Sequence, residues 1–252
     1  MLTLAFLCLR DAFTMTIYLP QLTADETQFP DAKTALNEPE GLLAMGGDLA
    51  PKRLLNAYRC GIFPWFSEGE PILWWSPAER ATIEPQNCHI SSSMRRLIRK
   101  NNVTVTINHA FPDVINYCAQ PRAAQAETWI TKKMIDAYIK LHHYGAAHSI
   151  EVWQGDKLVG GLYGVAIGRI FCGESMFSRV SNSSKIAFIA LNQHLSRFSG
   201  KLIDCQMQTA HLRSLGVLKI SRQQFILNLQ KYRDKNTETG CWQRQTISLS
   251  CK

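Results

Sequence analysis

Polar and apolar residues alternate along several short stretches of the chain, and this period of two predicts β-strands. The pattern is clear at 103–107 (VTVTI) and recurs at 148–154, 157–168 and 169–177. Short links that contain glycine separate the last three stretches, so we expect them to form a three-stranded antiparallel meander. The segment KLIDCQM (201–207) predicts one further strand.

Other segments repeat apolar positions every three or four residues, which predicts amphipathic helices. The first follows Asp48 and ends before Gly61, so a side-chain acceptor precedes its first turn and a permissive glycine follows its last. Leu54, Leu55 and Tyr58 share the face of this helix that we expect to be buried. Further helices are predicted at 111–119, at 131–145 with Gly145 as terminator, at 183–198 ended by Gly200, and after Ser221, which has capping-box spacing to Gln224.

The local amino-acid composition of the sequence changes near Arg80. Before this point, segments 38–49 and 61–77 are crowded with glycine, proline and tryptophan, which is typical of ordered loops and short strands. The whole order of strands and helices predicts an α+β fold with a mixed sheet, an order seen in N-acyltransferase folds, although fold alone does not decide chemistry. We expect a non-structural extension at 1–15 with Met15 as an alternative start, a small N-terminal α/β domain at 16–80, and a larger domain at 81–252.

The chain of 252 residues carries 28 Lys and Arg against 20 Asp and Glu, a formal net charge of +8. This excess favours a polyanionic partner, but it does not distinguish RNA from DNA, an anionic membrane or an acidic protein. A solvated helix face is the alternative explanation for any single basic run. One such run at helical spacing within SSSMRRLIRK comprises Arg95, Arg96, Arg99 and Lys100.

The eight cysteines lie far apart and form no Cys-x-x-Cys pair or Cys/His cluster with the spacing of a zinc site. We expect reduced thiols in a cytoplasmic protein that uses neither a metal nor a cofactor. The apolar run LTLAFLCL is far shorter than the ~20 residues that span a bilayer, so no membrane segment is expected. Arg10 and Asp11 follow it where a signal peptide would have small residues.

Two side chains of the predicted strand KLIDCQM carry the first candidate chemistry. By alternation, Asp204 and Gln206 leave one face together, and Cys205 leaves the other, where we expect a buried packing thiol. In FCGESMF, the same alternation puts Glu174 beside Met176 on one face. Taken alone, a carboxylate on a strand is most often a satisfied structural hydrogen-bond partner.

Tryptophan supplies the second candidate. Trp65, Trp74, Trp75 and Trp129 lie in polar or proline-rich surroundings, away from periodic core positions. An exposed indole stacks on an unpaired base with ~1–3 kcal/mol, although core packing is the commoner use of this residue. Trp65 and Trp129 are the stronger candidates for base stacking, with core packing as the alternative.

These segments occur together in one known family. The order seen in the leucyl/phenylalanyl-tRNA–protein transferases is matched by EPEGLLAMGGDL, LLNAYRCGIFPWFSEGEPILWWSP, ETWIT, AHSIEVW, LVGGLYGVA, FCGESMFSR and LIDCQ. The sequence closely resembles that family from about Leu36 to the region of Gly216. The resemblance implies a small N-terminal domain followed by an acetyltransferase-like domain. It also implies an enzyme that moves Leu or Phe, with Met as a further candidate, from aminoacyl-tRNA to the N-terminal Lys or Arg of other proteins and so marks them for degradation.

Carried over position by position, the resemblance implies roles for individual residues. Asp204 and Gln206 would be the catalytic pair, and Glu174 would lie beside the reacting ester or meet the basic side chain of the acceptor. Trp65 and Trp129 would hold the 3′-terminal adenosine of the tRNA. No oligomeric partner is implied, and we expect a monomer.

The aminoacyl side chain would enter a pocket lined by Met176, Phe171 and Leu162. Simple alternation puts Phe171 and Met176 on opposite faces of their strand, so their joint assignment requires a β-bulge or a different wall of the cavity. The tRNA phosphates would meet the basic run that begins at Arg95, with Lys132 and Lys133 as additional contacts.

The implied chemistry needs no strong base. An α-amine has a reference pKa of ~7.7–8.0, so a useful neutral fraction exists near pH 7. Alignment of amine and ester contributes ~7–11 kcal/mol, against about 3–5 kcal/mol from a proton-transfer group. We therefore expect Gln206 to orient the amine, and Asp204 to polarise its amide and accept the proton eventually.

Two departures from the family pattern and two alternative functions stand beside this interpretation. Ser92 stands where many members have Arg, and Thr209 replaces an Asn often found after Asp-Cys-Gln. An acyl-CoA-dependent N-acetyltransferase would share the fold, but SRVSNSSKIA lacks the glycine-rich turn that presents backbone amides to the CoA pyrophosphate. A non-catalytic RNA-binding protein would explain the charge and the tryptophans, but it would leave Asp204, Gln206 and Glu174 without a role.

Overall fold

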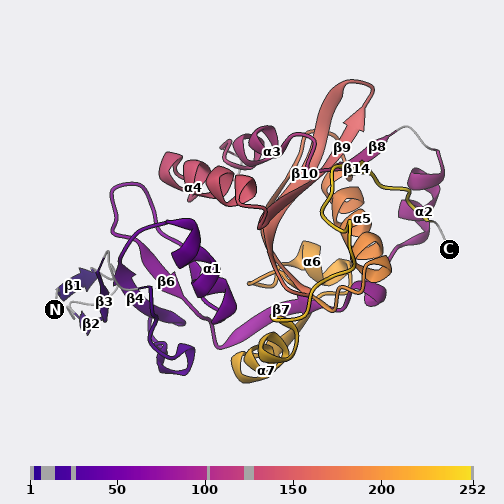
Figure 1. Cartoon of the computed structure of the whole chain (residues 1–252). Coiled ribbons are helices and arrows are strands. Elements are labelled where there is room, and N and C mark those ends of the chain that lie inside the picture. Colours follow the sequence, from indigo (N-terminus) through magenta and orange to yellow (C-terminus); the bar gives the residue numbers. More distant parts are fainter. Residues whose placement is uncertain (1–2, 7–14, 24–26, 101–102, 122–127, 251–252) are drawn as a thin grey trace.

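The computed structural model describes residues 3–6, 15–23, 27–100, 103–121 and 128–250. Within them, most strands form one eight-stranded sheet with the order β13–β7–β12–β11–β10–β9–β8–β14 (Figure 1). These strands are β7 (Glu79–Ile83), β8 (Thr104–Ile107), β9 (Ala147–Gln154), β10 (Lys157–Ile167), β11 (Ile170–Ser178), β12 (Leu202–Asp204), β13 (Leu218–Ser221) and β14 (Gln245–Thr246).

The predicted meander is confirmed, because β10 pairs antiparallel with both β9 and β11. β11 and β12 are parallel, and the long helix α5 connects them. The sheet is therefore mixed, as predicted, and the architecture combines mixed sheets with helices. The helices are α1 (Pro51–Arg59), α2 (Ser92–Arg99), α3 (Phe111–Cys118), α4 (Lys132–His143), α5 (Ser183–Arg197), α6 (Ala210–Ser214) and α7 (Arg222–Tyr232), with short 3₁₀ turns at Ala32–Thr34 and Pro85–Asn87.

The predicted helices are confirmed and α6 was not predicted. The start of α1 differs in detail from the prediction. Its N-cap residue is Ala50, and Pro51 occupies the first helical position, where its missing N–H costs no hydrogen bond. Asp48 instead accepts from the Ala50 N–H (2.9 Å) and from Arg53 Nε (3.1 Å). At α7, Ser221 is the N-cap and accepts from the Gln224 N–H, as the spacing predicts.

A smaller four-stranded sheet precedes the large one. It contains β3 (Gln21–Leu22), β4 (Leu42–Gly46), β5 (Phe63–Pro64) and β6 (Leu73–Trp75) in the order β3–β4–β6–β5. A separate pair, β1 (Thr3–Phe6) and β2 (Met15–Tyr18), is antiparallel. The extension predicted to be non-structural at 1–15 thus includes a strand, while residues 7–14 lie outside the described residues.

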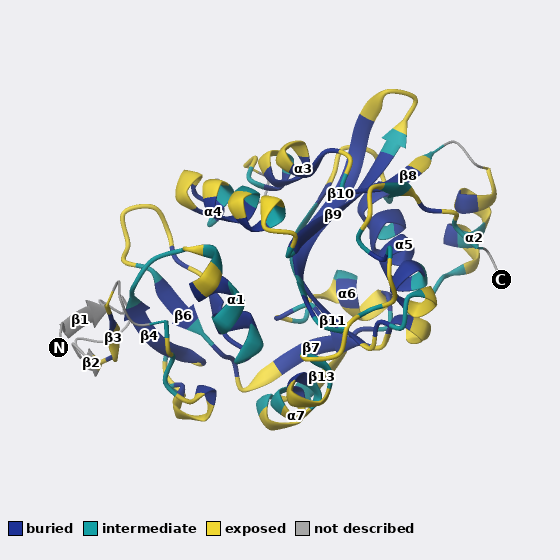
Figure 2. Cartoon of the chain, in the orientation of Figure 1, coloured by how far each residue is buried: buried dark blue, intermediate teal, exposed yellow. Residues whose placement is uncertain are grey.

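Two hydrophobic cores lie on opposite faces of the large sheet (Figure 2). One core joins α1, α3 and α4 to β10 and β11 through Tyr163 and Cys172. The other packs α5 against the same strands through Leu162 and Phe171. Because α1 shares the first core with α3 and α4, the small sheet and the large sheet are joined by continuous apolar packing. No described helix combines the length and the apolar composition needed to cross a membrane.

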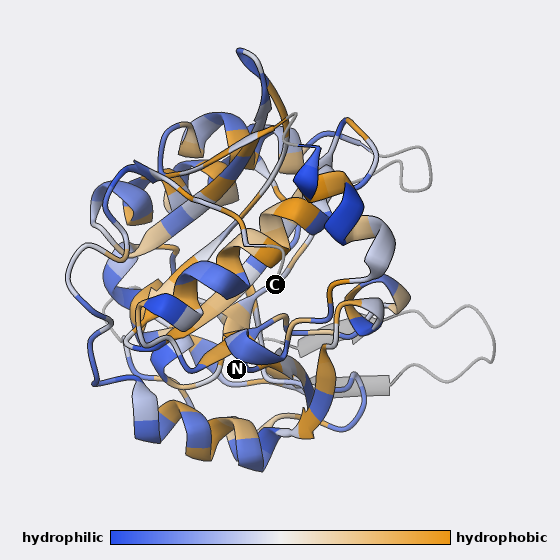
Figure 3. Ribbon diagram, turned by 90° about the vertical axis from the view of Figure 1, so that its right-hand side faces the viewer, coloured by the Kyte–Doolittle hydropathy of each residue, from blue (hydrophilic) through white to orange (hydrophobic). Residues whose placement is uncertain are grey.

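Helix α5 is buried almost all round its circumference. A helix of this kind needs cover on the side that faces away from its sheet. The segment after α7 supplies the cover: it runs across α5 and ends in β14, which pairs with β8 at the sheet edge (Figure 1). Figure 3 faces the end of the molecule where the C-terminus lies, and hydrophilic and hydrophobic residues alternate along the helices there.

Candidate active site

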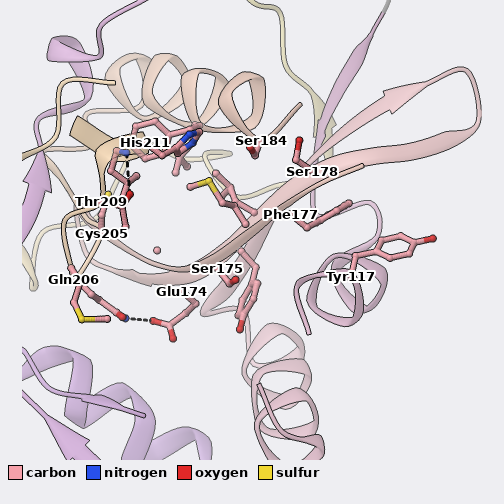
Figure 4. Close-up of a pocket in the computed structure, with 18 of the residues that line it drawn as sticks. Tyr117, Glu174, Ser175, Phe177, Ser178, Ser184, Cys205, Gln206, Thr209 and His211 are labelled. Atoms are coloured by element: carbon pink, nitrogen blue, oxygen red, sulfur yellow. Dashed lines mark hydrogen bonds between the residues drawn. The ribbon is translucent and has the colours of Figure 1, made fainter. Parts of the chain in front are cut away.

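A cavity of about 670 Å³ opens beside β11. Its walls come from β5 of the small sheet, from β10 and β11 of the large sheet, and from α5 and α6. Figure 4 shows Glu174 and Gln206 on one side of the cavity and Ser184 and His211 on the other. The predicted catalytic and substrate-binding residues that line it are Trp65, Trp129, Leu162, Phe171, Glu174, Met176 and Gln206.

An irregularity in β11 decides which side chains share a face. Met176 pairs with Leu162, but the register then shifts and leaves Glu174 as an extra residue opposite β10. This β-bulge brings Phe171 and Met176 to the same face, where both pack with the α5 core. A β-bulge was required if Phe171 and Met176 were to line one pocket, and this bulge is present.

The same bulge separates Glu174 from Met176. The Glu174 carboxylate accepts from Tyr138, which belongs to the core on the opposite face of the sheet from Met176. Alternation predicted one face for both residues, and this prediction was wrong because an extra residue reverses the parity of a strand. Both side chains nevertheless line the cavity.

Glu174 and Gln206 form the polar side of the cavity. Gln206 Nε2 donates to Glu174 Oε1 at 2.7 Å (Figure 4). The Tyr138 hydroxyl donates to Glu174 Oε2 at 2.9 Å, and the Tyr58 hydroxyl of α1 is hydrogen-bonded to Tyr138. Both tyrosines are fully buried. The carboxylate is therefore held at both oxygens, and the hydrogen bonds that hold it extend into α1, which lies between β4 and β5 of the small sheet.

Burial raises the pKa of Glu174 to about 7, although hydrogen bonds from the Tyr58 and Tyr138 hydroxyls lower it against that effect. Burial, followed by the charge of Glu174, raises the pKa of both tyrosines, which keeps them protonated as donors. A carboxyl group that changes its charge near pH 7 is a frequent feature of functional sites.

The strand β12 ends at Asp204, so the predicted alternation does not continue to Gln206. Gln206 has a φ of +60°, a left-handed conformation that is uncommon outside glycine. Asp204 is fully buried and accepts from Arg80 Nε (3.1 Å) and Nη2 (2.6 Å), and its Oδ1 also accepts from the backbone N–H of Gln206 (2.9 Å). Asp204 therefore holds the backbone of Gln206, and only Gln206 of the two lines the cavity.

Sequence reasoning missed the partner of Asp204. Arg80 is 1 % exposed, its guanidinium lies 4.3 Å from the Phe225 ring centroid, and its Nη1 donates to the Gly61 carbonyl at 2.6 Å. A single arginine at the start of a strand carries no signal of this role, because the partner lies 124 positions away. Tyr138 was likewise missed, since it occupies an ordinary buried position of a helix.

The tryptophans divide into two groups. Trp65 is 39 % exposed and lines the cavity with the half-buried Trp129. Trp74 is fully buried, and its Nε1 donates to the Gly46 carbonyl at 2.9 Å, so it is a core residue. Trp75 meets Trp65 edge to face at 5.6 Å and donates from Nε1 to its carbonyl. Of these four tryptophans, Trp65 and Trp129 are thus the two that line the cavity.

Two polar residues on the far side of the cavity were not predicted. His211 has a buried Nε2 without a hydrogen-bond partner, and burial lowers its pKa. Ser184 lies at the start of α5 and points toward the cavity (Figure 4). Thr209, which departs from the family pattern, is the N-cap of α6 and accepts from the Leu212 N–H. Cys205 also lines the cavity, and burial raises its pKa above the usual range, so it is an unreactive packing thiol.

The basic run lies on α2, away from the cavity lining. Met94 and Ile98 face the core, whereas Arg96 and Arg99 are exposed on the other side. Arg95 is partly covered, and its Nε donates to the Ile90 carbonyl at 3.1 Å. Lys100 is exposed at the end of the helix; Lys132 and Lys133 are exposed on α4, where Lys132 pairs with Asp136. In the part of the chain that the structure describes, no group of three or more His, Cys, Asp or Glu side chains converges as metal ligands would.

A held carboxylate and a carboxamide face the cavity, and comparison with known proteins identifies the class of the chain. Residues 82–230 match the family described as leucyl/phenylalanyl-tRNA protein transferase, and residues 47–78 match its N-terminal domain. The chain therefore belongs to the leucyl/phenylalanyl-tRNA–protein transferase family, and the resemblance seen in its motifs is confirmed.

Individual relatives cover nearly the whole chain. A leucyl/phenylalanyl-tRNA–protein transferase of Psychromonas ingrahamii is 61% identical over 235 residues, which are 93% of this chain and 99% of that protein. The enzyme of the same name from Tolumonas auensis is 50% identical over 236 residues, 93% of this chain and 100% of that protein. That of Pectobacterium carotovorum is 53% identical over 230 residues, 91% and 97% of the two chains.

Proposed function

We propose that this chain transfers Leu or Phe, with Met as a further candidate, from aminoacyl-tRNA to the N-terminal Lys or Arg of acceptor proteins and so marks them for degradation. The observation that carries the proposal is the hydrogen-bonded pair Glu174 and Gln206, which faces a cavity whose remaining lining is mostly apolar. The shared name of the relatives supports the same reaction.

The reaction needs alignment more than activation. The acceptor amine nitrogen attacks the ester carbonyl carbon, a C–N bond forms, and the C–O bond to the terminal ribose breaks. The amine loses a proton, and the ribose oxygen gains one. Because the ester is already reactive and a neutral amine is available near pH 7, the ~7–11 kcal/mol from alignment is the largest contribution that the site makes.

Gln206 is proposed to orient the incoming amine. Its Nε2 donates to Glu174, so its side-chain carbonyl oxygen is the end left to accept a hydrogen bond from an N–H group. The backbone bond to Asp204 and the left-handed conformation fix the position of this amide. An amide held in this way aligns the amine without taking its proton.

Asp204 is proposed as a positioning residue. Both its oxygens accept from Arg80, and its remaining contact with Gln206 is to the backbone N–H. This arrangement supports a role in fixing Gln206 and not the polarisation of its amide or the uptake of a proton. The nearer group for a proton is Glu174, whose pKa burial raises to about 7.

The remaining cavity residues are proposed to bind the two ends of the donor. Trp65 and Trp129 would stack on the 3′-terminal adenosine, which their exposure and their place on the cavity wall support. Glu174 would lie beside the ester. Each of its oxygens already accepts a hydrogen bond from the enzyme, which makes contact with the basic side chain of the acceptor the less favoured role. The aminoacyl side chain would enter the apolar end formed by Leu162, Phe171 and Met176.

The tRNA body is proposed to contact the basic side of α2 through sequence-independent phosphate contacts of Arg95, Arg96, Arg99 and Lys100. We also propose a domain boundary near residue 80, which the change of sheet between β6 and β7 supports, and an acetyltransferase-like class for the second domain, which the parallel β11–α5–β12 unit supports. A monomer in the cytoplasm, where charged tRNA is made, completes the proposal.

One assay tests the activity. Radiolabelled leucyl-tRNA is supplied with a peptide that begins with Arg and with one that begins with Ala. Label should enter only the first peptide, and ribonuclease treatment of the donor should abolish transfer. The variant Gln206→Ala should fail, while Gln208→Ala, on the same loop but outside the cavity lining, should not. RNA binding without any transfer would instead support a non-catalytic RNA-binding protein.

A further inference from the structure

The segment at 235–250, here called the C-terminal strap, is tied to α5 along its length. The His194 ring is hydrogen-bonded to the Cys241 carbonyl at 2.7 Å, and Arg197 Nη1 donates to the Ser248 carbonyl at 3.0 Å. The Gln193 side chain exchanges two hydrogen bonds with the backbone of Ser250, at 2.7 and 2.8 Å. The strap is therefore held in one register across the helix that forms a wall of the cavity.

Trp242 of the strap is partly buried and packs against β9. The Trp242 indole stacks on the His148 ring with a centroid distance of 4.2 Å and an interplanar angle of 5°. Asn108 holds the strap at this point, because its Nδ2 donates to the Trp242 carbonyl at 2.7 Å and lies 3.1 Å from His148 Nδ1. The indole of Trp242 is thus packed against β9, and the backbone of Trp242 is held by Asn108.

Trp242 also touches a residue of the cavity wall. The Phe171 ring lies 5.4 Å from the Trp242 ring at 27°, and Phe171 lines the cavity beside Leu162 and Met176. The Phe171 ring crosses Gly164 of β10 so closely that a Cβ there would lie 2.6 and 2.7 Å from two of its carbons. The backbone at Gly164 blocks one direction of movement, and Trp242 blocks another.

We propose that Trp242 is a specificity-determining positioning residue, which sets the depth of the aminoacyl side-chain pocket by holding the Phe171 ring forward into the cavity. The inference rests on the proposed function, since it takes this end of the cavity as the place of the Leu or Phe side chain. It assigns the strap a part in choosing the donor, through a ring that the donor itself does not touch.

The alternative is that Trp242 only anchors the strap. The two roles differ in what they do to substrate choice, because an anchor changes the amount of folded enzyme and leaves the ratio between two donors unchanged. A deeper pocket favours the larger side chain, because one extra or missing methylene changes the substrate preference of such a pocket by roughly several-fold or more. Trp242→Ala should therefore raise kcat/KM for phenylalanyl-tRNA relative to leucyl-tRNA by roughly 5-fold or more.

The test measures that ratio for each variant with both charged tRNAs and an Arg-initiated peptide. Trp242→Ala should raise the ratio, and Trp242→Phe should restore most of the wild-type value because an aromatic ring still backs Phe171. Ile247→Ala is the matched control: it removes a buried strap side chain that packs with the α5 core, and it should leave the ratio unchanged. A ratio within 2-fold of wild type in Trp242→Ala, or an equal rise in Ile247→Ala, overturns the proposal.

Repeating the substitution in a Phe171→Ala variant keeps the test independent of folding. In Phe171→Ala, no ring remains for Trp242 to hold, so adding Trp242→Ala should change the donor ratio no further. A further rise of the same size in the double variant would show that Trp242 acts by another route and would overturn the proposal. Failure of the proposed function is a separate result, because the wild-type protein would then transfer neither amino acid.

Discussion

The two sides of the cavity are built from different kinds of interaction. The polar side is a chain of directional hydrogen bonds that begins in α1 and ends on β7, through Tyr58, Tyr138, Glu174, Gln206, Asp204 and Arg80. The apolar side is formed by packed side chains: Leu162, Phe171 and Met176. Hydrogen bonds hold reacting groups in one geometry, whereas packing against an adaptable thioether tolerates side chains of different shape.

Each side also depends on a residue behind the wall. Arg80 stands behind Asp204, and Trp242 stands behind Phe171. The first contact is an ion pair with both partners almost fully buried, so it is sensitive to any loss of charge. The second is a ring contact whose loss leaves a void and no unpaired group. Damage to the polar side should therefore reduce stability and turnover, and damage to the apolar side should mainly change substrate choice.

The largest expected effect follows from breaking the buried ion pair. Asp204→Asn should lower the free energy of unfolding by about 3–5 kcal/mol, because it leaves the Arg80 guanidinium buried without a compensating charge. Denaturant unfolding measures this loss. The double variant Arg80→Met with Asp204→Leu should recover much of it, since no charge remains buried. A loss below about 1 kcal/mol in Asp204→Asn would contradict the role given to the pair.

The next effect separates alignment from binding. Gln206→Ala should lower kcat about 10²-fold or more, in the range found when one oriented polar group is removed from an active site, with KM for the charged tRNA nearly unchanged. Steady-state kinetics with saturating Arg-initiated peptide measures both constants. An equal loss in kcat and in affinity would place Gln206 in donor binding instead of alignment.

The two neighbouring tryptophans offer a smaller contrast. Trp65→Ala should weaken binding of the charged tRNA by ~1–3 kcal/mol, the energy of one base stacked on an aromatic ring, and should leave the thermal midpoint nearly unchanged. Trp74→Ala should do the reverse, because its indole is fully buried and its removal leaves a large void. If both variants lost stability equally, Trp65 would be a packing residue.

The pH dependence sharpens the account of the polar side. Ionised Glu174 accepts from both Tyr138 and Gln206, so protonation removes one acceptor and releases the aligned amide. Because burial raises the pKa of Glu174 to about 7, log kcat/KM should fall with a slope near two on the acid side, one proton from Glu174 and one from the acceptor amine. Glu174→Gln should retain only the slope of one from the amine.

The same shift has a consequence for stability, with a definite sign. Burial raises the pKa of Glu174 above its ordinary value of 4.5 to about 7, so the folded state binds this proton more tightly than the unfolded state. Its contribution to stability is present at acid pH and is lost as the pH rises from about 4.5 to about 7. Glu174→Gln should lack this decline. Thermal midpoints of the two proteins at pH 5 and pH 8 provide the comparison.

Local patterns predict the meander and most of the helices, since each depends on neighbours within a few positions. The residues that line the cavity were assigned mainly through the resemblance to the family. Local patterns fail where distant residues intervene. Alternation assigns Glu174 and Met176 to one face, but the bulge in β11 reverses the parity. Alternation also predicts that the strand continues through Gln206. The strand instead ends at Asp204, whose carboxylate pairs with the distant Arg80.

The partners behind the walls left no local signal either. Arg80 lies at the predicted domain boundary, and nothing near Trp242 in the sequence indicates a role for that residue. Their roles depend on contacts with Asp204 and Phe171, which are far away in the chain. The charge pattern of α2 is the opposite case, because helical spacing alone gives the exposed basic side correctly.

The smallest expected effect concerns that basic side, which lies outside both walls of the cavity. Replacing Arg96 and Arg99 by Gln should reduce the slope of log Kd for tRNA against log salt by about one to two, with little change in the donor ratio or in kcat, because phosphate contacts carry no sequence or side-chain information. Lys52→Gln on α1 removes an exposed charge from the other end of the molecule and serves as the control. An unchanged slope in the double variant would show that the tRNA body does not contact α2. A slope that falls equally in Lys52→Gln would mean that the net charge of the protein attracts the tRNA. The basic side of α2 would then not be a specific tRNA-binding surface.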